Sequence, residues 1–103
     1  MNKSDEEVIK IQIAISLRTL LQYNKEYARK KEKYVEIIDS YEKIALNADI
    51  RKATVTSAFN GSTRTAMTTV IIIIEAMGFT LNDFSKIYSE IDSKQISDFR
   101  ARR

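Results

Sequence analysis

An all-α fold is predicted for this chain, in the form of a compact bundle of five or six helices, and three observations predict it. Proline is absent and glycine occurs only at Gly61 and Gly78, so residues that break helices are rare. Apolar residues recur at three- and four-residue steps along most of the chain. The length of 103 residues, with 44% apolar and 30% charged residues, fits one globular domain with one function.

The first helix is expected over roughly residues 5–23. Ser4 is placed to cap this helix, and the acidic residues that follow suit the positive end of the helix dipole. The sequence therefore predicts an amphipathic N-terminal helix. Its buried face is expected to consist of apolar residues at helical spacing, namely Val8, Ile11, Ile15, Leu17, Leu20 and Leu21.

Residues 24–39 are rich in helix formers and are expected to form a helical insertion, which extends the N-terminal helical region over residues 1–39. Three tyrosines spaced by seven residues follow one helical stripe here: Tyr27, Tyr34 and Tyr41. One interpretation is that these rings pack on the core while a basic cluster faces solvent. The alternative is a basic arm that contacts phosphate, or a seam that pairs with a second copy. The basic cluster is Arg29, Lys30, Lys31 and Lys33.

Two short helices, joined by about three residues, are expected next. Asp39 and Glu42 fit a capping arrangement at the start of the first helix. The second helix is expected to begin near Arg51 and to end at Asn60 and Gly61, which are a common helix stop. The residues expected to face the core are Ile44, Ala45 and Ala48 in the first helix and Val55, Ala58 and Phe59 in the second.

The four consecutive isoleucines at 71–74 favour a strand by preference, but this run is assigned to a helix. Its apolar neighbours keep helical spacing, Gly78 suits a helix stop, and the sequence has no second strand-like run to pair with it. Thr80 and Asp83 then fit the capped start of a last helix, with Leu81, Phe84, Ile87, Tyr88 and Ile91 on its apolar side. Residues 93–103 are expected to be a mobile basic tail with Arg100, Arg102 and Arg103 at its end.

A series of small and apolar residues runs without a gap from about Ser40 to Ile87: Ile44-Ala45, Ala48, Ile50, Val55, Asn60-Gly61 and Ala76-Met77-Gly78. In this order they resemble the helix-turn-helix family of lambda repressor and Cro, which includes the XRE-type regulators. Ala45 matches the small residue where the two helices cross, and Val55 matches the β-branched residue that packs on the first helix. Asp49 departs from the pattern, because the family usually has glycine in this turn. The insertion after the first helix is a second departure.

The resemblance implies that residues 40–92 form a DNA-binding core in which the helix from Arg51 to Asn60 reads the major groove. The base-reading residues that it implies are Arg51, Lys52, Ala53, Thr56 and Ser57. The phosphate contacts that it implies are Ser40, Tyr41, Asn60, Ser62, Thr63 and Arg64.

The sequence therefore predicts a sequence-specific transcriptional regulator that binds double-stranded DNA as a homodimer, because one such domain contacts few base pairs. Pairing is expected through the first helix and the insertion, or through the last helix around Phe84 to Ile91. The alternative is a protein-interaction module, such as an antitoxin-like partner, that uses the N-terminal helical region. The net charge of +3 permits a polyanionic partner without requiring one.

An enzyme is not expected. The chain has no cysteine and no histidine, so it lacks a thiolate nucleophile, an imidazole base and the usual transition-metal ligands. The carboxylates of Glu75, Asp83 and Glu90 are expected on helix surfaces without a shared site, and no cofactor or small-molecule effector is predicted. No apolar run approaches the roughly 20 residues that span a bilayer, and Met1–Glu7 does not resemble a signal peptide. A cytoplasmic protein without a membrane partner is expected.

Overall fold

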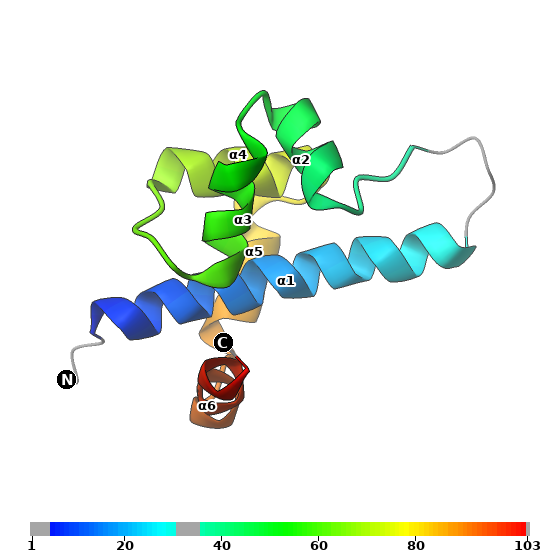
Figure 1. Cartoon of the computed structure of the whole chain (residues 1–103). Helices are drawn as coiled ribbons and strands as arrows, with labels where there is room; N and C mark the ends of the chain where they lie inside the picture. Colours follow the sequence, from blue (N-terminus) through cyan, green and yellow to red (C-terminus); the bar gives the residue numbers. More distant parts are fainter. Residues whose placement is uncertain (1–4, 31–35, 103) are drawn as a thin grey trace.

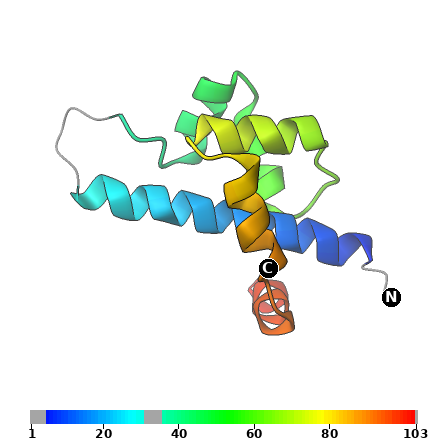
Figure 2. The same cartoon turned by 180° about the vertical axis from the view of Figure 1, so that it is seen from behind.

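The computed structural model describes residues 5–30 and 36–102 and confirms the all-α fold. Within these residues the chain forms six helices and no strand: α1 (Glu6–Lys30), α2 (Tyr41–Ala48), α3 (Lys52–Asn60), α4 (Met67–Ala76), α5 (Leu81–Ser89) and α6 (Ser93–Ala101). Figures 1 and 2 show α2, α3 and α4 on one side of the long helix α1 and α6 on the other side. Helix α1 is therefore the element against which the two sides of the molecule pack.

Helix α1 continues to Lys30, so its predicted end near residue 23 is wrong. Its first two thirds bury apolar residues, and the remainder stays helical through good helix formers although most of its side chains are exposed. The expected tyrosine stripe is only partly present. Tyr41 packs on Phe59 with ring centroids 4.7 Å apart, whereas Tyr27 is 48% exposed. Tyr34, Lys31 and Lys33 lie outside the described residues.

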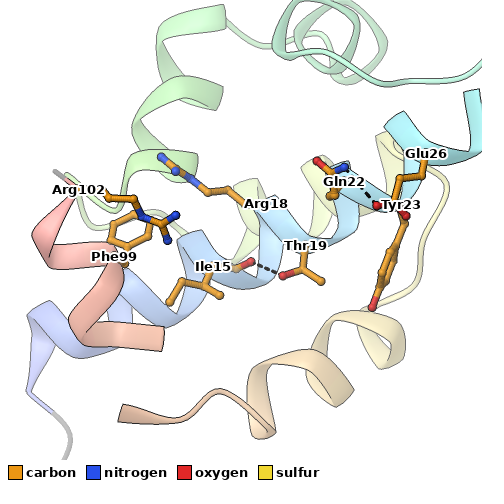
Figure 3. Close-up of a pocket in the computed structure, with 8 residues that line it drawn as sticks. All are labelled: Ile15, Arg18, Thr19, Gln22, Tyr23, Glu26, Phe99 and Arg102. Atoms are coloured by element: carbon orange, nitrogen blue, oxygen red, sulfur yellow. Dashed lines mark hydrogen bonds between the residues drawn. The ribbon is translucent and has the colours of Figure 1, made fainter. Parts of the chain in front are cut away.

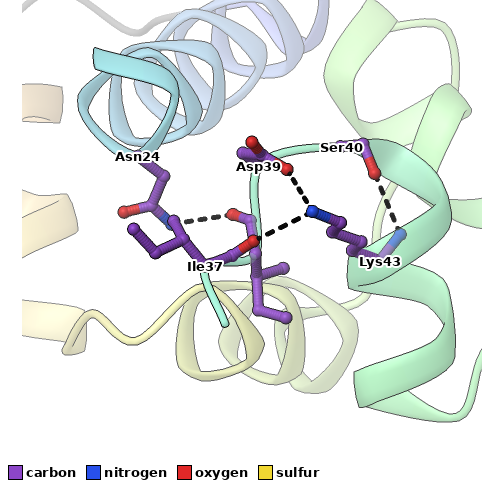
Figure 4. Close-up of polar contacts among 6 residues, drawn as sticks. Asn24, Ile37, Asp39, Ser40 and Lys43 are labelled. Atoms are coloured by element: carbon purple, nitrogen blue, oxygen red, sulfur yellow. Dashed lines mark hydrogen bonds and ion pairs between the residues drawn. The ribbon is translucent and has the colours of Figure 1, made fainter. Parts of the chain in front are cut away.

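The segment 36–40 is not helical, and polar contacts fix it between α1 and α2. Figure 4 shows the amide of Asn24 pointing from α1 toward this segment, where its Nδ2 donates to the carbonyl oxygen of Ile38 at 2.8 Å. The same nitrogen donates to the carbonyl oxygen of Met77 at 2.9 Å, which links the end of α4 to both. Lys43 Nζ pairs with Asp39 at 2.9 Å from the other side. These bonds position the start of α2.

The two short helices α2 and α3 and their connection confirm the predicted pair. The residue that caps α2 is Ser40 rather than Asp39, because its hydroxyl accepts from the amide of Lys43. Asp49 takes the left-handed conformation with φ 57° in the turn, where glycine is the usual residue. Gly61 ends α3 with φ 63°, also left-handed.

The core lies between α1 and the helices α2 to α5. The isoleucine run is helical, as predicted, and α4 contributes Val70, Ile73 and Ile74 to the core. Thr80 and Asp83 form the predicted capping box at the start of α5. No single helix in the described ranges is long and apolar enough to cross a membrane; α4 and α5 reach that length and apolarity only together, across a bend of 108°.

Helix α6 replaces the mobile tail that was expected, so that expectation is wrong for residues 93–102. Asp92 and Gln95 form a capping box that starts the helix. Phe99 is buried in a small second cluster with Ile11 and Ala14 of α1. The capping pair and one aromatic residue therefore hold this segment on α1, although the three arginines near its end suggested a solvated tail.

Candidate functional site

Helix α3 presents a polar face without acidic residues. Val55, Ala58 and Phe59 are buried in the core. The helix contains one lysine and neither Asp nor Glu. Its hydroxyl and cationic groups therefore suit an anionic partner. The residues that are exposed or half-exposed are Arg51, Lys52, Ala53, Thr54, Thr56, Ser57 and Asn60.

An open groove of ≈ 460 Å³ lies beside this face, between α3, the loop at 62–66 and the start of α4. We call it the α3–α4 groove. It brings together five of the residues that were predicted to contact DNA: Arg51, Ala53, Ser57, Thr63 and Arg64. Four residues that the sequence analysis missed complete the lining: Thr54, Thr65, Ala66 and Thr69. The groove therefore joins hydroxyl groups from two helices and a loop with two guanidinium groups.

The helices that meet at this groove lack the side-chain caps that the other short helices have. Ser40, Thr80 and Asp92 accept hydrogen bonds from amides in the first turns of α2, α5 and α6. Arg51 and Ala66 occupy the same position in α3 and α4, and neither side chain makes a capping hydrogen bond. Both residues line the groove. Helices α3 and α4 thus both begin at this groove, and no side chain caps the first-turn amides or the positive end of the dipole of either helix.

Two of the predicted cationic contacts take part in ion pairs. Lys52 Nζ pairs with Glu42 of α2, and Arg64 Nε pairs with Glu6 of α1. The hydrogen bond from Lys52 holds the pKa of the Glu42 carboxyl below its ordinary value. All four side chains are more than half exposed, so water weakens both pairs. A phosphate group can therefore compete for either cation.

Three of the predicted phosphate contacts have structural partners. The hydroxyl of Ser40 caps α2, and the ring of Tyr41 packs on Phe59. The side-chain oxygen of Asn60 accepts a hydrogen bond from Arg18 of α1 at 2.9 Å. Ser40 and Tyr41 line a separate groove of ≈ 320 Å³ together with Lys52, away from the α3–α4 groove. Five predicted residues thus line the α3–α4 groove and three line this second groove, whereas Thr56, Asn60 and Ser62 line neither.

The residues that the sequence analysis missed differ in how they could have been found. Thr54 lies three residues from both Arg51 and Ser57, so helical spacing places all three on adjacent positions of α3. The packing of α4 on α2 and α5 brings Thr69 in its first turn, and Thr65 in the loop before it, to the groove. That placement depends on the tertiary packing of α4 and has no local signal.

Other chemistry has little support in the described residues. They contain no group of three or more acidic, histidine or cysteine side chains placed to hold a metal ion. Asp83 and Glu90 line one groove of ≈ 370 Å³ with Lys86, whereas Glu75 does not line it. The carboxylate of Asp83 accepts from the amide of Thr80 at 2.8 Å and serves as part of the cap of α5.

No model of a protein family, no curated protein and no solved structure matches the chain.

Proposed function

We propose that the α2–α3 pair is a helix-turn-helix and that the protein is a sequence-specific DNA-binding regulator of transcription. The observation that carries this proposal is the α3–α4 groove, where two helix N-termini without side-chain caps meet two arginines and several hydroxyl groups. Backbone amides at helix N-termini and guanidinium groups both bind phosphate. A groove of this kind beside an exposed polar helix suits a DNA backbone that runs past a reading helix.

In this arrangement α3 supplies the base contacts. Arg51 and Lys52 at its start donate to guanine acceptors, and Ala53 and the methyl group of Thr56 meet thymine methyl groups. Ser57, which is half-exposed, donates or accepts beside them. Phosphate contacts come from the groove, through Thr63, Arg64 and the threonines Thr54, Thr65 and Thr69. Ser62 does not line the groove, but it is exposed in the same loop and can add a contact. Ser40, Tyr41 and Asn60 then act chiefly by fixing α2 and α3 in place.

The ion pairs of the free protein are compatible with this role. When DNA binds, Lys52 leaves Glu42 to contact the DNA, and Arg64 leaves Glu6 to contact a phosphate group. Exposed pairs are weakened by water and contribute little to stability, so this exchange costs little. Each phosphate that a cation neutralises releases counterions, so affinity for every duplex should fall as salt rises.

A second copy of the chain completes the proposal, because one reading helix contacts too few base pairs for discrimination. Large apolar side chains are available for pairing. Tyr23 and Tyr27 of α1 are 50% and 48% exposed, and Leu81 at the start of α5 is 45% exposed. Sedimentation should show dimers by high micromolar concentration or on DNA. The bound DNA sequence should contain two half-sites. Monomers in both conditions would contradict the proposed homodimer.

An interaction module remains the second candidate, and one observation favours it. Leu46 on the outer side of α2 is 84% exposed, which is unusual for a large apolar residue. A protein partner that covers Leu46 would use the α2 side of the molecule rather than the α3–α4 groove, because Leu46 lines a different groove with Asp49 and Ile50. A module of this kind should show no salt-dependent shift of duplex DNA.

Selection of bound sequences from a random duplex pool tests the proposed function. We expect one enriched motif, and the variant Thr56→Ser, which loses the methyl group and keeps the hydroxyl, should relax the preference for thymine at one position of that motif. Thr68→Ser is the matched control, because Thr68 is exposed on α4 and does not line the α3–α4 groove. A pool that shows no enrichment, or a Thr56→Ser motif identical to that of the parent, would count against α3 as the reading helix.

A further inference from the structure

A groove of ≈ 420 Å³ lies on the face of α1 where α6 packs, and none of the proposed DNA contacts lines it. We call it the α1–α6 groove. Figure 3 shows its lining side chains projecting from α1 and from α6. Six come from α1, one from α6 and one from the residue that follows α6: Ile15, Arg18, Thr19, Gln22, Tyr23, Glu26, Phe99 and Arg102. Its volume lies in the range of about 300–1,000 Å³ that is usual for small-molecule sites.

The groove combines two guanidinium groups with an apolar floor. Arg18 and Arg102 form no ion pair within the described residues. The one carboxylate in the groove, that of Glu26, accepts a hydrogen bond from Gln22 Nε2 at 3.3 Å. Ile15, Tyr23 and Phe99 supply the apolar surface. An anion suits the guanidinium groups, and a flat apolar body suits the rings.

Arg18 links this groove to the end of α3. Its Nε donates to the carbonyl oxygen of Phe59 at 2.7 Å and one terminal nitrogen donates to Asn60 Oδ1 at 2.9 Å. Its guanidinium also lies over the ring of Phe99, 4.8 Å from the centroid. A guanidinium has five N–H donors, so these two bonds leave three for a ligand. A ligand in the groove therefore shares one side chain with the last turn of α3.

We propose that the α1–α6 groove binds a small aromatic monocarboxylate, and that this ligand acts through Arg18 on the C-terminal end of α3. A planar carboxylate fits the remaining donors of Arg18 and Arg102, and the aromatic ring fits the accessible surfaces of Ile15 and Tyr23. Phe99 is nearly buried and its ring lies under Arg18, so it supports Arg18 rather than the ligand. A bare phosphate leaves the apolar floor uncovered, and its second negative charge is opposed by Glu26. Ligand binding does not depend on the proposed function; only its effect on DNA affinity rests on that function.

Nuclear magnetic resonance titration of the full chain with naphthoate tests the site without DNA. We expect saturable shifts of the groove residues together with Phe59 and Asn60, with a Kd of about 1 mM, as ligand efficiencies suggest for a molecule of this size. Naphthylmethanol, acetate and inorganic phosphate each lack one half of the recognition and should bind at least about tenfold weaker. No saturation, or equal binding of any of the three, overturns the proposal.

A pair of charge-matched variants tests the location. Arg102→Ala removes a guanidinium from the groove. Arg100→Ala removes one from α6, two residues earlier, where it pairs with Glu7 outside the groove. Arg102→Ala should weaken naphthoate about tenfold and Arg100→Ala should leave it unchanged. Equal effects of the two variants, or shifts in the parent that exclude Phe59 and Asn60, contradict the proposal. If the protein binds naphthoate but no DNA, the ligand site is supported and the proposed DNA-binding function is contradicted.

Discussion

Arg51 and Lys52 are neighbours at the start of α3 but differ in their surroundings. Lys52 pairs with Glu42, whereas Arg51 has no ion pair within the described ranges and lines the α3–α4 groove. Arg51→Ala should therefore weaken binding to the preferred duplex by about 1–3 kcal/mol. Lys52→Ala should cost less, because Lys52 must leave Glu42 before it contacts DNA. Fluorescence anisotropy with both variants checks this order, and a larger loss for Lys52→Ala would reverse the assignment.

Asp83 makes the cap of α5 sensitive to acid. Its carboxylate accepts from the amide of Thr80, and this hydrogen bond holds the pKa of Asp83 below its ordinary value of 3.8. Because the pKa is lower in the folded state, the carboxylate stabilises the fold fully above its unfolded pKa. That contribution disappears as the pH falls through the lower folded value.

We therefore expect Asp83→Asn to reduce the free energy of unfolding at pH 7 and to lose less of it than the parent on acidification to about pH 2. Urea unfolding at both pH values measures this difference. Asp98→Asn is the control, because Asp98 pairs with Lys94 and caps no helix. An equal acid dependence for the parent and for Asp83→Asn would show that the cap does not contribute.

At the scale of elements, Gly61 fixes how closely α1 approaches the end of α3. A Cβ atom at Gly61 would lie 3.1 Å from the carbonyl oxygen of Lys10, whereas one at Gly78 would meet nothing within 4 Å. Both glycines have positive φ, so each substitution to alanine carries backbone strain of about 1 kcal/mol. Gly61→Ala should cost about 1 kcal/mol more than Gly78→Ala, because α1 must also move. Thermal unfolding of both variants checks this, and equal costs would contradict the close approach.

Helix α6 depends on Phe99 for its position on α1. Phe99 is 5% exposed, and Phe99→Ala should reduce the free energy of unfolding by about 3 kcal/mol. Ile96→Ala should cost less, because Ile96 is only partly buried in the same cluster. Hydrogen exchange of the α6 amides provides a second measurement and should accelerate in Phe99→Ala. If neither measurement changes, the result would support the mobile tail that the sequence predicted.

How much of each element could be predicted from the sequence depends on how local its cause is. The bounds of α3 follow from the spacing of Val55, Ala58 and Phe59 and from Gly61, all of which lie within one short segment. The predicted end of α1 was wrong because the apolar spacing stops near residue 23, whereas the helix formers that follow keep the chain helical to Lys30. The position of the segment 36–40 depends on bonds from Asn24, which also reaches the distant carbonyl of Met77, and has no local signal. Helix α6 was not predicted because the segment is polar and basic, although the capping pair Asp92 and Gln95 is a local signal for a helix start.

At the scale of the whole molecule, the candidate site required packing that no sequence pattern expresses. The α3–α4 groove forms where the loop and the start of α4 meet one face of α3, and the link from Arg18 to Phe59 joins residues far apart in the chain. Residues on one helix, such as Arg51, Ala53 and Ser57, could be predicted together because helical spacing relates them. Residues on different elements, such as Thr69 and Thr54, could not.

Helix α1 lies between the two sides of the molecule, and one arginine from each side pairs with it. Arg64 and Arg100 each pair with a glutamate in the first turn of α1, with Glu6 and with Glu7. Arg64 lines the α3–α4 groove, whereas Arg100 belongs to α6. The two substitutions to alanine therefore remove the same charge and the same kind of ion pair, and they differ in place.

The most direct measurement is the salt dependence of binding to a preferred and a scrambled duplex, for the parent, Arg64→Ala and Arg100→Ala. We predict that Arg64→Ala weakens both duplexes about equally and reduces the slope of log affinity against log salt by about one, because one phosphate contact is lost. Arg100→Ala should retain the affinity and the slope of the parent. A parent without salt-dependent binding, or identical behaviour of the two variants, would contradict DNA binding through the α3–α4 groove.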